Sequence, residues 1–291
     1  EDPRHMWNSP EAGISLQSSS PTWKTVNGIK TFVDGRGETF ASPALKVLDV
    51  SSWQGEIDWQ AVKNSDVDAV ILRAGYGIGN LDDTFAYNVQ QVKRYGIPYG
   101  IYLYSYAYDA SFASREAAWV AEIIQKYNCQ DMSLPVYFDL ENWGSWKENG
   151  ITRYVPTKPS EYEKIVDAFT NTLASRGVTN VHVYTYRAYL QSALDSPDIW
   201  SITSWIAEYN PTLAIDNTYY AGQYGWQYTS NGSVPGVAGG VDLSAFSDWD
   251  YRNVTHLSAV DIPDGTYYLN AQIRDSSGIT IKDDSTASGA T

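Results

Sequence analysis

Hydrophobic and polar positions follow two alternating kinds of pattern between Leu45 and about Phe246. Short runs rich in Val, Ile, Leu and Tyr are separated by longer stretches in which apolar residues recur at helical spacing. This order is typical of a parallel sheet or barrel whose strands are joined by helices. The runs predict eight strands, at residues 45–51, 68–74, 98–106, 134–141, 181–186, 204–209, 222–228 and 240–245.

Three of the intervening stretches predict helices, at residues 82–95, 111–126 and 159–176. The last of these has Thr157 as its expected N-cap and Gly177 just past its end. After the sixth strand the gaps shorten, and residues 210–246 hold too much Gly and Pro for a full helix. The predicted fold is therefore α/β, an irregular TIM-like (β/α) barrel with about eight strands and fewer than eight helices.

The ends of the chain differ in pattern from its middle. Residues 1–44 carry little periodicity and predict an N-terminal arm, packed on or trailing from the predicted barrel of residues 45–250. Residues 251–291 predict a linker and a partial C-terminal module, because about thirty residues cannot bury a core alone. Residues 264–291 resemble one repeat of a ricin-type β-trefoil lectin. No signal-peptide pattern opens the sequence, and we expect residues 1–10 to be a processed end.

Composition narrows the class of ligand. The net charge is −14, which makes nucleic acid a poor partner, since phosphate binding requires Lys and Arg patches. The single cysteine, Cys129, cannot form an internal disulfide, and no metal-binding Cys/His spacing occurs, so we expect no metal and no cofactor. No apolar run is long enough to predict a membrane span. The chain holds 23 Tyr and 11 Trp against 7 Phe, and such amphipathic rings suit stacking on sugars.

Two acids alternate along the fourth predicted strand. Side chains on a strand point to opposite faces in turn, so Tyr137, Asp139 and Glu141 share the face that points into the barrel. Burial of two acids side by side should raise at least one pKa. A protonated acid beside an ionised one is the combination that glycosidic cleavage needs. The alternative is that both acids cap helices or pair with arginine.

Two further acids lie on strands that are neighbours in a closed barrel. Asp49 lies on the first strand and Asp242 on the eighth, each opposite apolar residues of its own strand. We expect both near the carboxyl ends of their strands, where barrel active sites lie. Each acid taken singly could be a satisfied core group. Four acids that converge from three strands favour a catalytic site.

Aromatic residues alternate along the same strands. Some of them must fill the barrel, and the outermost are the candidates for stacking on sugar rings. Arg73 closes the second strand, and we expect it to pair with one of the acids or to form an ordinary buried ion pair. The candidate substrate-binding residues are Tyr76, Tyr104, Tyr106, Tyr186, Trp205 and Trp226, together with Arg73.

Several motifs are similar to those of glycoside hydrolase family 25, the muramidase lysozymes. They occur in the family's order and cover roughly residues 45–250. The matching pieces are LDVSSWQG at 48–55, IDW at 57–59, FDLE at 138–141, YTY at 184–186, WIAEY at 205–209, WQY at 226–228 and GVDLS at 240–244.

This resemblance implies cleavage of the β-1,4 bond between N-acetylmuramic acid and N-acetylglucosamine. It implies that Glu141 is the general acid and that Asp139 assists the substrate's own 2-acetamido group. Asp49 and Asp242 would complete an acidic floor that positions substrate or water. Spacing leaves open whether the mechanism is substrate-assisted or inverting. Some family members carry a His-bearing motif on the third strand, where this chain has Tyr and Ser, so details of sugar binding differ.

The expected partner is the glycan strand of peptidoglycan, and the expected oligomeric state is a monomer. The expected location is extracellular or at the cell wall, as a secreted autolysin or a phage endolysin. Two alternatives remain at this stage. One is a catalytically weak glycan-binding wall protein, and the other is an endo-hydrolase of chitin-like chains.

Overall fold

The computed structural model describes residues 19–214, 225–247, 254–256 and 271–273. The chain divides into two compact units, residues 1–248 and 249–291. In the second unit, β15 (Val254–His256) and β16 (Ala271–Ile273) pair antiparallel. The rest of the predicted linker and lectin-like repeat lies outside the described residues, so that prediction stays open.

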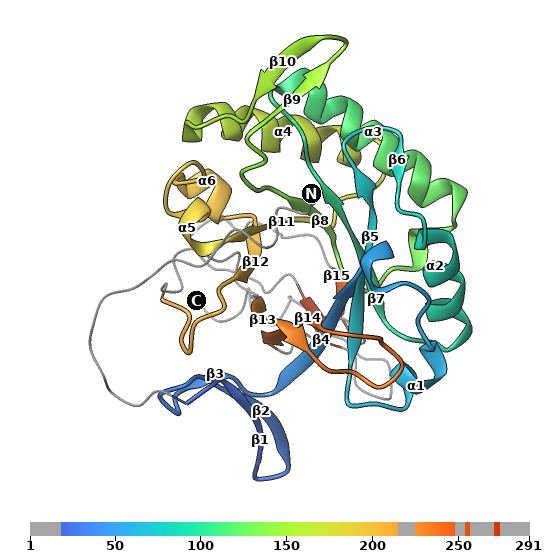
Figure 1. Cartoon of the computed structure of the whole chain (residues 1–291), viewed down its shortest axis with the longest axis vertical. Helices are drawn as coiled ribbons and strands as arrows, with labels where there is room; N and C mark the ends of the chain where they lie inside the picture. The colour runs from blue at the N-terminus through green and yellow to red at the C-terminus, as the bar shows by residue number, and fades with distance from the viewer. Residues whose placement is uncertain (1–18, 215–224, 248–253, 257–270, 274–291) are drawn as a thin grey trace, which may run out of the picture. The chain divides into compact units, whose positions relative to one another are not determined.

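The first unit contains a closed barrel of eight strands (Figure 1), and this confirms the predicted fold class. Seven neighbouring strands run parallel from β4 to β13, and β14 closes the barrel antiparallel to both β13 and β4. The strands are β4 (Ala44–Val50), β5 (Ala69–Tyr76), β7 (Tyr99–Tyr104), β8 (Val136–Asp139), β11 (Val181–Tyr186), β12 (Thr203–Ala207), β13 (Gly225–Gly232) and β14 (Val241–Ser247). The short β6 (Asn80–Leu81) pairs with the end of β5.

The direction of β14 corrects one prediction. Asp242 was expected near the carboxyl end of its strand, but it is the second residue of β14 and lies at the amino end. Because β14 is antiparallel, its amino end reaches the rim where the parallel strands finish. Asp242 is directly paired there with Asp49 on β4, so the expected meeting of these two acids does occur.

Helices cover part of the barrel, and the three predicted ones are confirmed. The described residues contain six α-helices, in agreement with the expectation of fewer than eight. The N-cap of the fourth is Lys158 and not Thr157, because Pro159 takes the first helical position, where its fixed φ is favourable. The helices are α1 (Trp59–Lys63), α2 (Phe85–Arg94), α3 (Ala110–Lys126), α4 (Pro159–Ser175), α5 (Arg187–Leu190) and α6 (Pro197–Trp200). None of them is long and apolar enough to cross a membrane.

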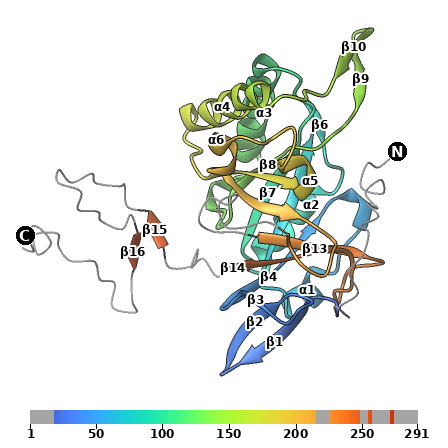
Figure 2. The same cartoon turned by 90° about the vertical axis from the view of Figure 1, so that its left-hand side faces the viewer.

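A small antiparallel sheet covers the side of the barrel that lacks long helices (Figure 2). It lies within the predicted arm and comprises β1 (Thr22–Val26), β2 (Ile29–Val33) and β3 (Thr39–Ala41). Asn27 and Gly28 have positive φ, as a two-residue hairpin turn requires. Phe32 is fully buried, with its ring centroid 5.6 Å from that of Trp226 and 4.5 Å from that of Tyr228. The sheet therefore buries the apolar outer face of β13.

A second hairpin, absent from the predictions, follows β8 and projects from the barrel (Figure 1). It consists of β9 (Ser145–Glu148) and β10 (Ile151–Tyr154), joined by Asn149 and Gly150 at positive φ. Asn-Gly is a strong signal for such a turn, and it was available in the sequence.

Candidate active site

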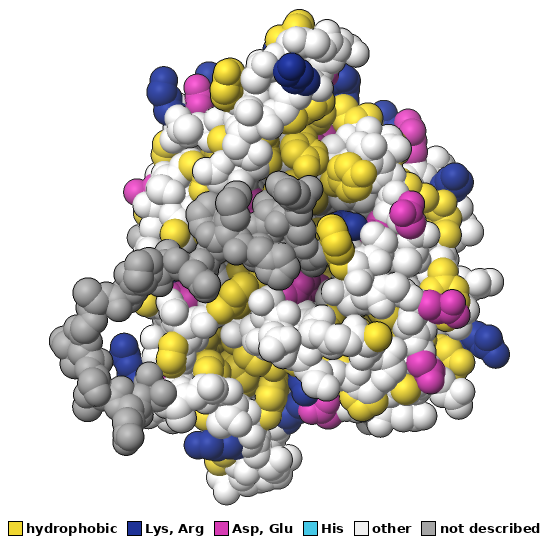
Figure 3. Space-filling view, in the orientation of Figure 1, with side chains coloured by type: hydrophobic (Ala, Val, Ile, Leu, Met, Phe, Trp, Pro, Cys, Tyr) yellow, Lys and Arg dark blue, Asp and Glu magenta, His cyan; other side chains and the backbone are white. Residues whose placement is uncertain are grey.

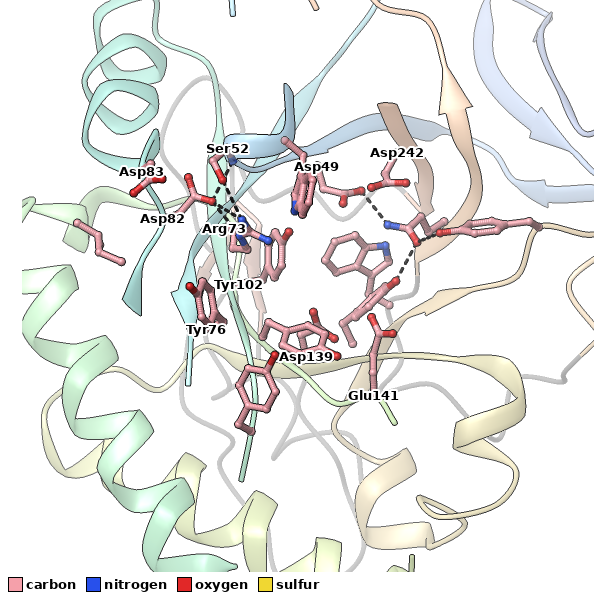
Figure 4. Close-up of a pocket in the computed structure, with 18 residues that line it drawn as sticks. Asp49, Ser52, Arg73, Tyr76, Asp82, Asp83, Tyr102, Asp139, Glu141 and Asp242 are labelled. Carbon is pink, nitrogen blue, oxygen red and sulfur yellow. Dashed lines mark hydrogen bonds and ion pairs between the residues drawn. The ribbon is translucent and has the colours of Figure 1, made fainter. Parts of the chain in front are cut away.

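A pocket of about 400 Å³ opens at the rim where the parallel strands end (Figure 4). Carboxylates and aromatic rings make up most of its lining. All four predicted acids line it, and their exposed fractions lie between 3% and 8%. We call these four residues the Glu141 cluster: Asp49, Asp139, Glu141 and Asp242.

The alternation along β8 brings Asp139 and Glu141 into the pocket. Phe138 points the other way and stacks on Phe169 of α4, with ring centroids 3.7 Å apart and 10° between their planes. Leu140, between the acids, is buried in the outer core. Its N–H donates to the carbonyl oxygen of Tyr184 at 3.0 Å, and its carbonyl accepts from Thr185 Oγ1 at 2.7 Å. These bonds keep the backbone extended beyond the end of β8, so Glu141 faces the same space as Asp139.

Asp49 is held by a neutral group that the sequence analysis did not select. Gln227 Nε2 donates to Asp49 Oδ2 at 3.0 Å. Gln227 Oε1 accepts from the hydroxyls of Tyr184 and Tyr209, each at 2.8 Å. Burial, followed by the nearby Tyr209 and the carboxylates, raises the pKa of Tyr184 well above its usual value. Tyr184 therefore remains a donor, which orients the Gln227 amide so that its nitrogen faces Asp49.

A second group of residues lies on the other side of the pocket, and we call it the Asp82 cluster: Ser52, Arg73, Asp82 and Thr84. Arg73 Nε donates to Asp82 Oδ2 at 2.8 Å, and the Ser52 N–H donates to the same oxygen at 2.9 Å. Asp82 Oδ1 accepts from the N–H and the hydroxyl of Thr84, at 2.9 and 2.7 Å. Burial alone would raise the pKa of Asp82, but these hydrogen bonds and the Arg73 charge lower it. Arg73 thus pairs with Asp82, outside the four predicted acids.

Four of the predicted aromatic residues line the pocket: Tyr76, Tyr104, Tyr106 and Trp205. Trp205 is only 1% exposed, so it belongs to the pocket floor and not to the rim. Its Nε1 donates to Ser244 Oγ at 2.9 Å, and its ring centroid lies 4.3 Å from that of Tyr184. The rim position expected for Trp205 is therefore wrong, although the residue is in the site.

Two predicted aromatic residues do not line the pocket. Trp226 is fully buried on the outer face of β13, and its Nε1 donates to the carbonyl oxygen of Glu208 at 2.7 Å. Its predicted rim position is wrong. Side chains alternate along β13 so that Gln227 points into the barrel and its neighbour Trp226 points outward. Tyr186 stacks on Tyr189, with ring centroids 5.3 Å apart. Burial, with a smaller effect of the Glu141 charge, raises the pKa of Tyr186.

Some lining residues were missed by sequence reasoning. Trp53 is 60% exposed at the pocket mouth, on the turn that follows β4, and Tyr209 is 44% exposed. Both lie in motifs quoted above, so the motifs contained a signal that strand alternation did not. Among the described residues, no group of three or more His, Cys, Asp or Glu is placed to hold a metal ion.

A closed barrel with a carboxylate-lined pocket at the rim is the arrangement of a barrel glycoside hydrolase. Residues 48–237 match the model of glycosyl hydrolases family 25. The chain belongs to this family, which confirms the resemblance seen in the motifs.

Relatives of known name agree with this assignment. The autolytic lysozyme of Clostridium acetobutylicum is 29% identical over 205 residues, which are 70% of this chain and 56% of the relative. Lysozyme M1 of Streptomyces globisporus is 25% identical over 202 residues, 69% of this chain and 67% of the relative. The structure of the autolysin LytC from Streptococcus pneumoniae, in complex with a synthetic peptidoglycan ligand, aligns with a TM-score of 0.71 and 38% identity. That alignment covers 77% of this chain and 52% of LytC, so this chain spans about half the length of LytC.

Proposed function

We propose that this chain is a muramidase that hydrolyses the β-1,4 bond between N-acetylmuramic acid and N-acetylglucosamine in peptidoglycan. The observation that carries the proposal is the convergence of four buried carboxylates in one pocket. The proposal is supported by family membership and by the relatives, which are named as lysozymes or as an autolysin bound to a peptidoglycan ligand. The acidic chain would hold its wall substrate through neutral sugar contacts.

Glu141 serves as the general acid in this proposal, and Asp139 assists the 2-acetamido group. The acetamido carbonyl oxygen bonds to C1 as the bond from C1 to the leaving oxygen breaks. Glu141 gives its proton to the leaving oxygen. Asp139 accepts a hydrogen bond from the acetamido N–H and stabilises the positive intermediate. Water then bonds to C1 as the bond from C1 to the acetamido oxygen breaks, and Glu141 takes up the proton that the water loses. Two displacements at C1 leave its configuration retained.

Asp49 and Asp242, the other two acids of the Glu141 cluster, position substrate or water. Their pairing across β4 and β14 and the Gln227 bond to Asp49 support this role, because they hold Asp49 in one orientation. Tyr104, Tyr106 and Tyr76 provide ring faces for the sugars at the mouth of the pocket. We further propose that the protein acts as a monomer at the cell wall, as a secreted autolysin or an endolysin.

The proposal is tested by digestion of purified peptidoglycan, followed by mass analysis of the fragments. Muramic acid at the new reducing ends is expected, and N-acetylglucosamine there would contradict the assigned bond. Release by Glu141→Gln should fall about 10³-fold, whereas Glu122→Gln, on the exposed surface of α3, serves as the matched control. The first anomer seen by NMR separates the mechanisms: a β-anomer indicates retention and an α-anomer indicates inversion.

The same assay separates the two alternative functions. Cleavage of N-acetylglucosamine oligomers without cleavage of muramic-acid strands would indicate a chitin-like substrate. Binding to walls without release of reducing ends would indicate a glycan-binding protein.

A further inference from the structure

Tyr106 belongs both to the pocket and to a group of aromatic rings outside it. Within the pocket, its ring centroid lies 5.3 Å from that of Tyr104 and 6.3 Å from that of Tyr76. Its ring centroid also lies 5.8 Å from that of Trp143 and 6.0 Å from that of Trp146, neither of which lines the pocket. The aromatic surface of the pocket therefore continues beyond its rim towards the β9–β10 hairpin.

The two tryptophans outside the pocket have different surroundings. Trp146 packs against Phe112 of α3 and against Tyr108, with ring centroids 5.6 and 6.4 Å away, and so anchors the hairpin to the barrel. Trp143 is half-buried and lies in the turn before β9. Asn142 Oδ1 accepts from the Gly144 N–H at 2.9 Å, and Gly144 has a φ of 71°. This turn presents part of the Trp143 ring to solvent.

Glu148 of β9 stabilises the hairpin through several polar contacts. Glu148 Oε2 accepts from the Tyr108 hydroxyl at 2.7 Å and from Arg153 Nε at 3.0 Å. Glu148 also forms an ion pair with Arg115 of α3 at 3.4 Å. Hydrophobic side chains gather on the surface between the hairpin and the pocket (Figure 3). The surface is thus supported by several contacts before any ligand arrives, which lowers the entropic cost of binding.

The backbone of Tyr106 is also held in place. Glu116 on α3 is fully buried, and it accepts from the Tyr106 N–H and from Ser105 Oγ, both at 2.8 Å. These bonds attach the loop after β7 to the helix behind it. Tyr106 is therefore a fixed part of the rim.

We propose that Tyr106 and Trp143 form a carbohydrate subsite outside the pocket, which binds the next sugar of the glycan strand as it leaves towards the β9–β10 hairpin. This inference rests on the proposed function, since the occupant is the same strand that fills the pocket. Continuity through Tyr106 supports that occupant, because one residue lines both surfaces. The apolar CH faces of a sugar match the aromatic ring of Trp143, a side chain that is half-buried.

The subsite predicts a dependence on strand length. For Trp143→Ala, we expect the ratio of KM for long soluble glycan strands to KM for the shortest fragment cleaved to rise about fivefold, the effect of one lost ring contact. In Trp143→Phe, which keeps an aromatic ring, this ratio of KM values should return most of the way to the wild-type ratio. Tyr154→Ala, which removes a 70% exposed ring from β10, is the control. An unchanged ratio in Trp143→Ala would overturn the subsite.

Binding without turnover separates this inference from the proposed function. The affinity of long strands is measured for Glu141→Gln and for the same protein with Trp143→Ala added. About fivefold weaker binding in the double variant supports the subsite, and equal binding overturns it. Failure of the wild type to release muramic-acid ends would instead contradict the proposed function, while this binding comparison still tests the subsite.

Discussion

The two sides of the pocket hold acids in contrasting surroundings (Figure 4). In the Asp82 cluster, both carboxylate oxygens of Asp82 accept hydrogen bonds and Arg73 supplies a positive charge. In the Glu141 cluster, the groups that hold the acids include the neutral Gln227 amide and the backbone around Leu140. An acid is therefore not catalytic merely because it lies in an active-site pocket. Asp82 is held ionised by its partners, so we assign it a structural role and leave proton transfer to Glu141.

The largest expected effect separates the two clusters directly. Glu141→Gln should lower kcat about 10³-fold, because an amide has no acidic proton to give to the leaving oxygen. Thermal unfolding should change little, since the amide has nearly the same shape. The measurement is release of reducing ends from purified peptidoglycan. Activity within tenfold of wild type would remove Glu141 from the role of acid and end the contrast with Asp82.

Asp82→Asn should act mainly on stability. Loss of the charge leaves Arg73, whose side chain is 14% exposed, without its partner, and should cost about 3 kcal/mol of unfolding free energy. In the wild type the Asp82 pKa is lowered, so its contribution is present above pH 3.8 and is lost as the pH falls below that value. Denaturant unfolding at pH 7 and pH 3 measures both effects. A variant as stable as wild type at pH 7 would contradict the structural role.

Gln227→Leu should reduce kcat/KM about tenfold, because Asp49 loses one hydrogen bond that sets its orientation. The hydroxyls of Tyr184 and Tyr209 lose the same partner. Steady-state kinetics on soluble glycan strands measures the effect. Asn231→Leu, in the exposed part of β13, provides the comparison, and an equal loss in both variants would show that Gln227 has no specific role.

Glu116, outside the pocket, is a buried acid whose pKa shifts in the direction opposite to that of Asp82. Burial raises the pKa of Glu116 to about 8, although hydrogen bonds from Tyr106 and Ser105 and the Arg115 charge oppose the shift. Its folded pKa lies above the unfolded one, so its contribution to stability is complete below pH 4.5 and is lost as the pH rises through about 8. The expected slope is about 1 kcal/mol per pH unit in that window. Glu116→Gln should flatten this slope in denaturant unfolding from pH 5 to pH 9. A slope identical to that of wild type would contradict the assignment.

Local sequence patterns account for the helices and strands and for the acids that face into the barrel. All eight strands and the three long helices follow from local hydrophobic spacing. The two-residue period predicted that Asp139, at the end of β8, and Glu141, two residues beyond it, face the same way. These features depend on neighbours within a few residues, so a linear pattern contains them.

Tertiary packing sets the direction of β14, the face of β13 that points into the barrel, and the partner of Arg73. Both faces of β13 are covered, one by the barrel interior and the other by the N-terminal sheet, so its polarity pattern does not reveal which face holds Trp226 and which holds Gln227. Asp82 reaches Arg73 through the fold of the loop after β5, which no periodicity encodes. Such choices depend on which distant surfaces meet, and the free energy of that packing belongs to the closed barrel as a whole and not to any one segment of the chain.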